Sequence, residues 1–501
     1  MHKLLRVLVC LGALLLVLAV MALLGVLSGD RSALQKYQAE LQAKGEKLTF
    51  AELTRGRQTN AVDSHTLITN AVVKLKDARI NPGSLAVLSY MGPGQARVAW
   101  RQASPKPSPT WPVSAGPGGS LGTWDEFTAQ MQAAQGTLQE IREALKEPTA
   151  DAGPCTNMLV GRRVNFVAIR TAAQWLMGAA ETDLHQGGLG LQDLEALAAL
   201  ARMERDEYTL VAQMIRVAVA GMGLGVTWDA LQAPGWTEPQ LARLQKAWEP
   251  VDLVEAVEKG FVGERASGYA IFSAVRHSRG PQIERLLRVG SAAGSSSSKA
   301  TIADVLRDYL YFPVYKLTSI DADELFYLTT VQEGITTLRL VRAQRPWPEA
   351  RKRGLTAVAR ITTIASSPSK LRYCLSMMCL PNYTRAGDRG VETEVERQMT
   401  LAAIALKRYE LRHGKLPASL EALVPEFLST VPYDYMAAKP LSYRLKADGS
   451  YVLYSVGEDG KDDGGDATPP SGTPPGLWAG RDAVWPSAAA ELAERPRQPD
   501  R

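Results

Sequence analysis

The sequence predicts a mainly α fold, with an N-terminal transmembrane helix, an irregular helical-bundle body and a small C-terminal α+β module. Three observations lead to this prediction. The chain begins with a long apolar run, its middle carries apolar residues at helical spacing, and two strand-like runs follow a long helical pattern near its end. The predicted segments are 1–28, 29–122, 123–290, 300–390, 391–466 and 467–501.

Residues 1–28 are predicted to be a membrane anchor. Leu4 to Leu27 is almost wholly apolar and is long enough to cross about 30 Å of hydrocarbon as a helix. Lys3 and Arg6 favour a cytoplasmic N-terminus, which would place the bulk of the chain outside the cytoplasm. The alternative is a cleaved signal peptide, because Val26-Leu27-Ser28 offers a cleavage site. The expected location is the bacterial inner membrane, in a single pass, with membrane lipid as a partner.

Composition limits the remaining classes. At 501 residues the chain has room for two or three domains. Its hydrophobic share of 46% and charged share of 22% are ordinary for a globular protein. The net charge of +5 is small, and the basic residues are spread along the chain without interleaved aromatic residues, so no nucleic-acid partner is predicted.

Residues 29–122 are predicted to hold an amphipathic helix, a possible hairpin and a linker. The expected helix, Ser32 to Leu53, carries an apolar stripe of Leu34, Tyr37, Leu41 and Leu48. Strands at Leu85–Tyr90 and Ala96–Trp100 are expected on either side of a Gly-Pro-Gly turn. Ser104 to Gly122 is rich in Pro, Gly and Ser, which is typical of an exposed linker.

Residues 123–290 are predicted to form an irregular helical bundle. Four stripes of apolar residues at helical spacing begin at Phe127, Phe166, Leu191 and Tyr208. The fourth stripe is apolar over most of its circumference, so we expect its helix to be central. Gly221 to Gly225 is expected to end that helix. Short connectors at Gly187-Gly188 and Arg205-Asp206 imply antiparallel neighbours.

Residues 300–390 are predicted to be helical, after a flexible serine-rich connector at Ser291–Lys299. A group of aromatic residues in this segment is interpreted as packing in the core. They are Tyr309, Tyr311, Phe312, Tyr315, Phe326 and Tyr327. Cys374 and Cys379 leave two alternatives open. They form a small disulfide in an oxidising compartment, or they are two free buried thiols.

Residues 391–466 are predicted to form a compact α+β unit. A helix over Val391–Arg412 is expected to end at Gly414, which can take the left-handed conformation of a helix C-terminus. A short helix over Leu420–Val424 follows, with Ser419 as a candidate N-cap. Two strands are then expected to form a hairpin on the long helix, one over Leu441–Leu445 and one over Tyr451–Val456.

This unit resembles the globular domain of type II secretion pseudopilins. The residues that carry the resemblance are Ala405-Leu406 with Tyr409, Gly414-Lys415-Leu416-Pro417, Tyr454-Ser455-Val456-Gly457 and Asp459-Gly460. In that family the helix continues directly from the membrane anchor, whereas here the helical body lies between the two. The resemblance implies a pilin-like α+β fold for this segment.

The whole chain also resembles large, uncharacterised membrane-anchored bacterial proteins. The shared order is an apolar anchor, a helical body, Ala403 to Pro425, the strand end at Tyr454–Gly457, and Val484-Trp485-Pro486. This likeness implies no activity. The last residues, 467–501, are rich in Pro and small side chains and are predicted to be a mobile tail.

An acidic glycine-rich loop at residues 457–466 is the best ligand candidate. Its carboxylates are Asp459, Asp462, Asp463 and Asp466. Carboxylate oxygens suit a hard cation, and the resemblance to major pseudopilins implies calcium in this region. The alternative is a solvated acidic turn, since no Glu closes the loop as in an EF-hand.

No catalytic constellation is evident in the sequence. The five histidines are not in metal-ligand spacing, and no nucleophile elbow, Walker loop or kinase set is present. Asp321, Asp323 and Glu324 form an acidic cluster that is interpreted as the first turn of a helix. The function expected is therefore a structural or protein-interaction role in the cell envelope, without catalysis, near a secretion or pilus-like system. The alternative is an envelope hydrolase with an acidic metal site.

Overall fold

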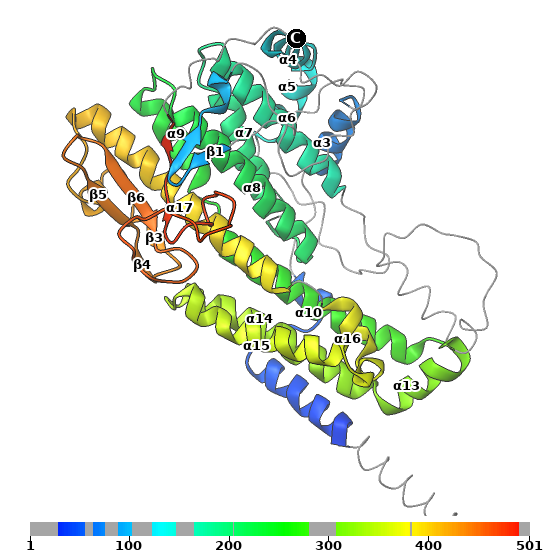
Figure 1. Cartoon of the computed structure of the whole chain (residues 1–501). Helices are drawn as coiled ribbons and strands as arrows, with labels where there is room; N and C mark the ends of the chain where they lie inside the picture. Colours follow the sequence, from blue (N-terminus) through cyan, green and yellow to red (C-terminus); the bar gives the residue numbers. More distant parts are fainter. Residues whose placement is uncertain are drawn as a thin grey trace, which may run out of the picture.

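The computed structural model describes residues 29–55, 64–75, 89–102, 123–146, 165–203, 205–279, 307–380 and 383–489 (Figure 1). The predicted anchor, the linker at Ser104–Gly122 and the connector at Ser291–Lys299 lie outside these residues. The prediction of a mainly helical chain with a small C-terminal sheet is confirmed for the described part.

The first half of the body is built from short and long helices. In chain order they are a helix over 29–43, α2 (Phe50–Leu53), α3 (Ser64–Val73), the 3-10 turn η2 (Ala99–Arg101), α4 (Trp124–Ala133), α5 (Gln135–Ala144), α6 (Phe166–His185), α7 (Leu191–Arg202), α8 (Leu210–Leu231), α9 (Glu238–Trp248) and α10 (Leu253–His277).

The second half begins with a π-helical turn and ends with the longest described helix. These elements are η3 (Arg307–Tyr311), α13 (Phe312–Thr318), α14 (Ile320–Arg342), α15 (Trp347–Ala365), η4 (Pro368–Leu371), α16 (Cys374–Cys379), α17 (Tyr383–His413) and η5 (Leu420–Leu423). In Figure 1, α10 and α14–α16 lie together in the lower part of the molecule, and α17 runs from there toward the upper left.

The helix over 29–43 buries Leu34 and Leu41 of the predicted apolar stripe and half-buries Tyr37, whereas Leu48 is buried beyond the end of the helix. It ends ten residues earlier than expected. Gly45 takes a left-handed conformation with φ +79° and turns the chain. Thr49 then starts α2 as an N-cap, and its own N–H donates in return to the Glu52 side chain at 2.9 Å.

Helix α8 is central, as its all-round apolar character predicts. It packs against α6, α7, α10 and α17. Among the described residues it is also the helix long and apolar enough to span a membrane, although 56% of its most apolar window is buried inside the protein. The prediction that Gly221–Gly225 ends this helix is wrong. The glycines lie inside α8 because a Cβ at Gly223 would be 2.8 Å from the Trp248 ring of α9, so they admit a close helix contact.

The aromatic residues near the start of the second half are mostly core residues. Phe312, Tyr315 and Tyr327 are buried, as predicted. Tyr309 differs, since its side chain is 69% exposed. The π-helical turn over Arg307–Tyr311 rotates it away from the core side of α13.

The C-terminal helix and hairpin match the prediction closely. Helix α17 begins eight residues before Val391, and Gly414 follows it with φ +68°. Strands β5 (Ser442–Leu445) and β6 (Tyr451–Ser455) pair antiparallel, with Ser442 opposite Tyr454. The predicted short helix is the 3-10 turn η5.

The described part of the predicted mobile tail, residues 467–489, contains two short strands where the prediction has none, and the rest of the tail lies outside the described residues. Strand β7 (Ala483–Val484) pairs with β6, and β8 (Ser487–Ala488) pairs in parallel with β2 (Gln95–Arg97). Strand β2 in turn pairs with β1 (Ser89–Gly92), which confirms a hairpin at the Gly-Pro-Gly turn. The second predicted strand, Ala96–Trp100, is too long, because Ala99 and Trp100 lie in the 3-10 turn η2, and residues 85–88 of the first lie outside the described residues. Composition was a poor guide to the tail. Pro and Gly lower the β-strand propensity of a segment, but they do not prevent short strands from pairing at the edge of a sheet. A second small ladder joins β3 (Tyr433–Asp434) to β4 (Lys439–Pro440).

One hydrophobic core spans the predicted segment boundaries. A single cluster of buried residues runs from Leu34 through the helical body to Leu453 and Val456 of the C-terminal unit. Helix α17 makes this possible, because it packs against α8, α9 and α10 on one side and carries the small sheets on another (Figure 1).

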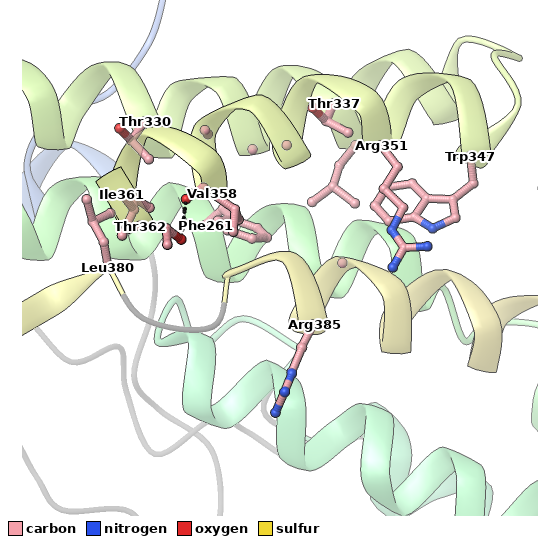
Figure 2. A pocket seen from close by; sticks show the side chains of 15 residues that line it. Phe261, Thr330, Thr337, Trp347, Arg351, Val358, Ile361, Thr362, Leu380 and Arg385 are labelled. Atoms are coloured by element: carbon pink, nitrogen blue, oxygen red, sulfur yellow. Dashed lines mark hydrogen bonds between the residues drawn. The ribbon is translucent and has the colours of Figure 1, made fainter. Parts of the chain in front are cut away.

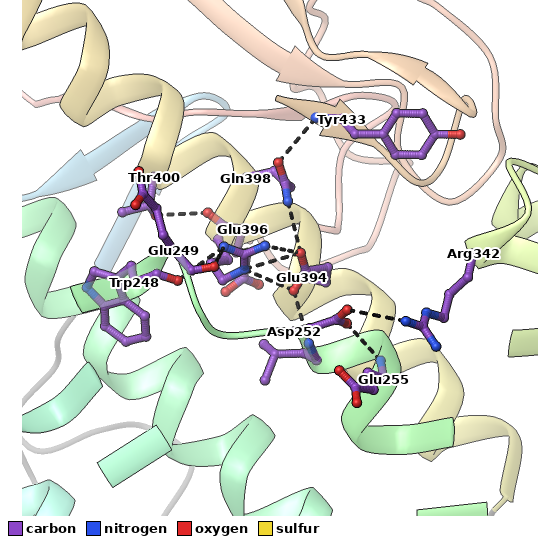
Figure 3. A network of polar contacts seen from close by, with 12 residues as sticks. Trp248, Glu249, Asp252, Glu255, Arg342, Glu394, Glu396, Gln398, Thr400 and Tyr433 are labelled. Carbon is purple, nitrogen blue, oxygen red and sulfur yellow. Dashed lines mark hydrogen bonds and ion pairs between the residues drawn. The ribbon is translucent and has the colours of Figure 1, made fainter. Parts of the chain in front are cut away.

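A buried ion pair fixes α17 to the body. The Arg397 Nη2 atom lies 2.6 Å from Glu394 Oε1, and both side chains are buried. Figure 3 shows how the pair reaches the α9–α10 junction. Arg397 donates to the Trp248 carbonyl at 3.1 Å, and Glu394 accepts the Leu253 N–H at 3.1 Å.

The same network extends to the C-terminal strands. Gln398 Nε2 donates to Glu394 at 3.0 Å, and Gln398 Oε1 accepts the Tyr433 N–H of β3 at 3.2 Å. The network thus satisfies the last carbonyl of α9 and the first N–H of α10 from a third helix. Helix ends that are buried need such partners.

We expect Arg397→Met to destabilise the protein by about 3–5 kcal/mol, because it leaves Glu394 buried without its cation. Urea unfolding followed by circular dichroism measures this. The matched control is Arg360→Met, which removes an exposed Arg–Glu pair with Glu333 and should cost about 0–1 kcal/mol. Equal effects of the two substitutions would contradict the structural role assigned to Arg397.

Candidate functional site

An apolar pocket of about 360 Å³ lies between α10, α14, α15 and the start of α17 (Figure 2). This volume is within the range of small-ligand and side-chain pockets. Its lining is formed by Phe261, Thr330, Gly334, Thr337, Leu338, Trp347, Arg351, Gly354, Ala357, Val358, Ile361, Thr362, Leu380, Arg385 and Gly387.

Small residues keep the pocket open. Helix α15 contributes Gly354 and Ala357, and α14 contributes Gly334, whose Cβ would lie 3.2 Å from the Phe261 ring. Gly387 similarly admits Trp347, since a Cβ there would lie 2.8 Å from that ring. The helices therefore approach closely at these small residues. Because the small residues fill little space, the volume that larger side chains would occupy is left as a cavity.

Arg351 stands at the Trp347 end of the pocket (Figure 2) and is neutralised locally. Its Nη2 donates to Asp388 Oδ2 at 2.9 Å, and its Nη1 lies 3.3 Å from Glu458. Trp347 Nε1 also donates to Asp388 at 3.3 Å. Burial raises the pKa of the Asp388 carboxyl, and Arg351 opposes that shift. This cluster holds the N-terminal end of α15 against Asp388 of α17 and Glu458 of the acidic loop.

The pocket lining offers binding chemistry more than reaction chemistry. It includes no Asp, Glu, His or Cys side chain. The hydroxyl groups of Thr330, Thr337 and Thr362 donate to carbonyls one turn back in their own helices, at 2.7, 2.8 and 3.0 Å. A general base or activated nucleophile is thus missing from the lining, whereas an apolar group would be well accommodated.

Three of the four aspartates of the predicted calcium loop are held by separate local partners, and the fourth, Asp463, donates its backbone N–H to Asp482. Asp459 accepts the Lys461 N–H, and Asp462 accepts the Gly464 N–H and lies 3.5 Å from Lys439 Nζ. Asp466 accepts the Thr468 N–H at 2.9 Å. The hydrogen bonds to backbone and hydroxyl groups lower the pKa of Asp462 and Asp466.

Sequence reasoning missed the carboxylate that organises this loop. Asp482 is buried, and it accepts backbone N–H groups from Asp463, Gly465 and Asp466 at 3.4, 2.7 and 3.2 Å. Asp482 lies sixteen residues after the loop, so no local sequence pattern connects the two. Within the described ranges, no group of three or more His, Cys, Asp or Glu side chains is placed to hold a metal ion.

Calcium binding by the loop stays a prediction and can be tested directly. The calcium hypothesis predicts that millimolar CaCl₂ raises the thermal unfolding midpoint of the full chain and that Asp462→Asn abolishes the rise. Asp448→Asn, in the β5–β6 turn, is the control and should leave the rise intact. An unchanged midpoint with calcium would favour a solvated acidic turn instead.

The other predicted acidic cluster is the first turn of α14, as expected. Its members are more buried than the sequence suggested. Asp323 accepts the Tyr315 hydroxyl at 2.5 Å and the Leu375 N–H at 3.0 Å, which ties α13 to the N-terminus of α16. Glu324 lies 2.5 Å from Arg276. These carboxylates are structural links between helices.

Cys374 and Cys379 are free thiols on α16, which resolves the alternative between a disulfide and two free cysteines. Burial raises the pKa of the Cys374 thiol to about 11 and that of Cys379 to about 12. At neutral pH both are therefore protonated and weakly nucleophilic.

A buried carboxyl pair, Glu181 of α6 and Asp229 of α8, also escaped the sequence analysis. Both side chains are 0% exposed, and within the described residues no group outside the pair donates a hydrogen bond to either oxygen of Glu181. The Ala99 N–H donates to Asp229 Oδ2 at 3.3 Å. Burial raises the pKa of Glu181 to about 8 and that of Asp229 well above its usual value. Two adjacent carboxyls without a cation are stable together only when at least one keeps its proton.

The pair predicts a pH dependence of stability. Between about pH 4.5 and 8 the folded protein holds a proton on Glu181 that the unfolded chain releases, so the free energy of unfolding falls as pH rises. We expect Glu181→Gln to flatten this fall, by up to about 1.4 kcal/mol per pH unit. Urea unfolding across that range measures it. Glu195→Gln on neighbouring α7 is the control. If Glu181→Gln leaves the slope of unfolding free energy against pH unchanged, Glu181 does not hold the proton assigned to it.

The chain matches no protein-family model, no curated protein and no solved structure. The resemblance of residues 391–466 to the pseudopilin domain therefore stays a prediction, carried by the residues that suggested it.

Proposed function

We propose that this protein is a single-pass, membrane-anchored and extracytoplasmic structural or interaction protein whose apolar pocket binds an apolar side chain of a protein partner. The pocket is the observation that carries the proposal. It is an open cavity of about 360 Å³ in the helical body with Phe261, Trp347 and Ile361 among its lining residues. Pockets that accept one buried apolar anchor are a common means of partner recognition.

The residues that line the pocket also help to decide between the two functions expected from the sequence. An envelope hydrolase with an acidic metal site needs carboxylates that converge in a concave site. The described residues of the pocket lining include none, and three carboxylates of the acidic loop, those of Asp459, Asp462 and Asp466, already accept hydrogen bonds from nearby backbone N–H groups. Binding is therefore the better supported of the two.

The cellular setting rests on sequence. The apolar run at Leu4–Leu27, preceded by Lys3, supports an inner-membrane anchor with the body outside the cytoplasm. Association with a secretion or pilus-like system rests on the pseudopilin resemblance of residues 391–466 alone, and fold-level likeness is a weak guide to function.

The proposal is tested by filling the pocket. We expect Ala357→Phe to lower partner recovery about tenfold or more, because one buried apolar anchor is worth about 1.5–3 kcal/mol. The tagged full chain is captured from solubilised membranes, and co-purifying proteins are quantified by mass spectrometry. Secretion components among the lost proteins would support the proposed association.

Ala359→Phe is the matched control, because Ala359 is an exposed residue of the same helix that does not line the pocket. It should leave recovery unchanged, and circular dichroism should show that both variants are folded. Equal recovery with both variants, or a chain that captures nothing specific, would contradict the proposed pocket function.

A further inference from the structure

The outward face of α13 and of the turn before it is apolar. Tyr309, Leu310, Val314 and Leu317 are 69, 61, 50 and 73% exposed. Leu310, Val314 and Leu317 are spaced i, i+4 and i+7, so they lie on one side of the helix. The opposite side is already used, since Phe312 and Tyr315 are buried in the core. This helix is thus apolar on both sides.

Neighbouring elements also carry exposed apolar side chains. Leu371 of η4 and Met378 of α16 are 58 and 54% exposed. The Tyr311 hydroxyl donates to the Leu371 carbonyl at 2.8 Å, which places η4 against α13. We name this surface the α13 patch, and its residues are Tyr309, Leu310, Pro313, Val314, Leu317, Leu371 and Met378.

The patch lies next to the point at which the chain enters the body. Arg372 directly follows Leu371, and its Nη2 lies 2.6 Å from Asp30 Oδ2 in the first described turn of the N-terminal helix. Asp30 comes three residues after Leu27, the end of the apolar run. In Figure 1 this helix, in dark blue, and α13 both lie in the lower part of the molecule.

We propose that the α13 patch rests on the lipid bilayer that the sequence Leu4–Leu27 crosses, and so forms a second membrane contact that sets the orientation of the body. The inference depends on the membrane anchor of the proposed function. An apolar helix face lies favourably in the headgroup region. The tether also keeps the patch close to the membrane, which raises its effective concentration there.

The charges around the patch fit the same surface. Lys370 is exposed beside Leu371, whereas Arg372 is already paired with Asp30. Basic residues next to an apolar surface are attracted to anionic lipid headgroups.

The experiment uses the full chain in liposomes of phosphatidylethanolamine and phosphatidylglycerol. Leu317→Cys is labelled with an environment-sensitive fluorophore, and nitroxide-labelled phospholipids serve as quenchers. Leu411→Cys is the matched control. Leu411 is an exposed leucine, 50% accessible, in the last turn of α17 at the upper left of Figure 1. The unchanged chain gives the background from native thiols.

We expect the label at residue 317 to shift to shorter wavelength and to lose most of its emission to the lipid quencher, while the label at residue 411 does neither. Chains that float with the liposomes but show no lipid quenching at residue 317 would overturn the patch while leaving the anchor standing. A blue shift without lipid quenching would mean that protein, from this chain or a second copy, covers the patch. Chains that fail to float would overturn the anchor and the patch together.

Discussion

The buried pair of Glu394 and Arg397 is the constraint on which the rest of the architecture depends. Neither charge is stable in the core alone, since an unpaired buried ion costs several kcal/mol. Together they bind the last carbonyl of α9 and the first N–H of α10, so their satisfaction requires α17 to cross this junction in one register. The position of every element that packs on α17 follows from that register.

Two further features depend on the placement of α17. Its first turns supply Arg385 and Gly387 to the apolar pocket, and Gly387 lets the Trp347 ring close one end. Its middle carries Gln398, which holds β3 and with it the small sheets. The helix thus joins the candidate binding pocket to the C-terminal unit, and one hydrophobic core covers both. The segments predicted as separate domains are therefore expected to unfold together.

The polar groups inside this protein serve mainly as joints between helices. Asp323 links α13 to α16, Asp482 gathers the acidic loop, and the Glu181–Asp229 pair lies between α6 and α8. Each is buried among backbone donors or another carboxyl, away from the pocket. Two apolar surfaces of the described residues, the pocket and the α13 patch, carry the two proposals made for this protein.

The sequence by itself determined the helical periodicity of α8 and α17, the stop at Gly414 and the β5–β6 hairpin, because these depend on local spacing and turn chemistry. Only the tertiary structure decided that Gly223 lies within a helix, that residues 483–488 add strands, and that Asp482 organises a loop sixteen residues before it. It also decided the pocket and the patch, since both arise where helices distant in sequence meet. Contacts of that kind leave no periodic signal in the chain.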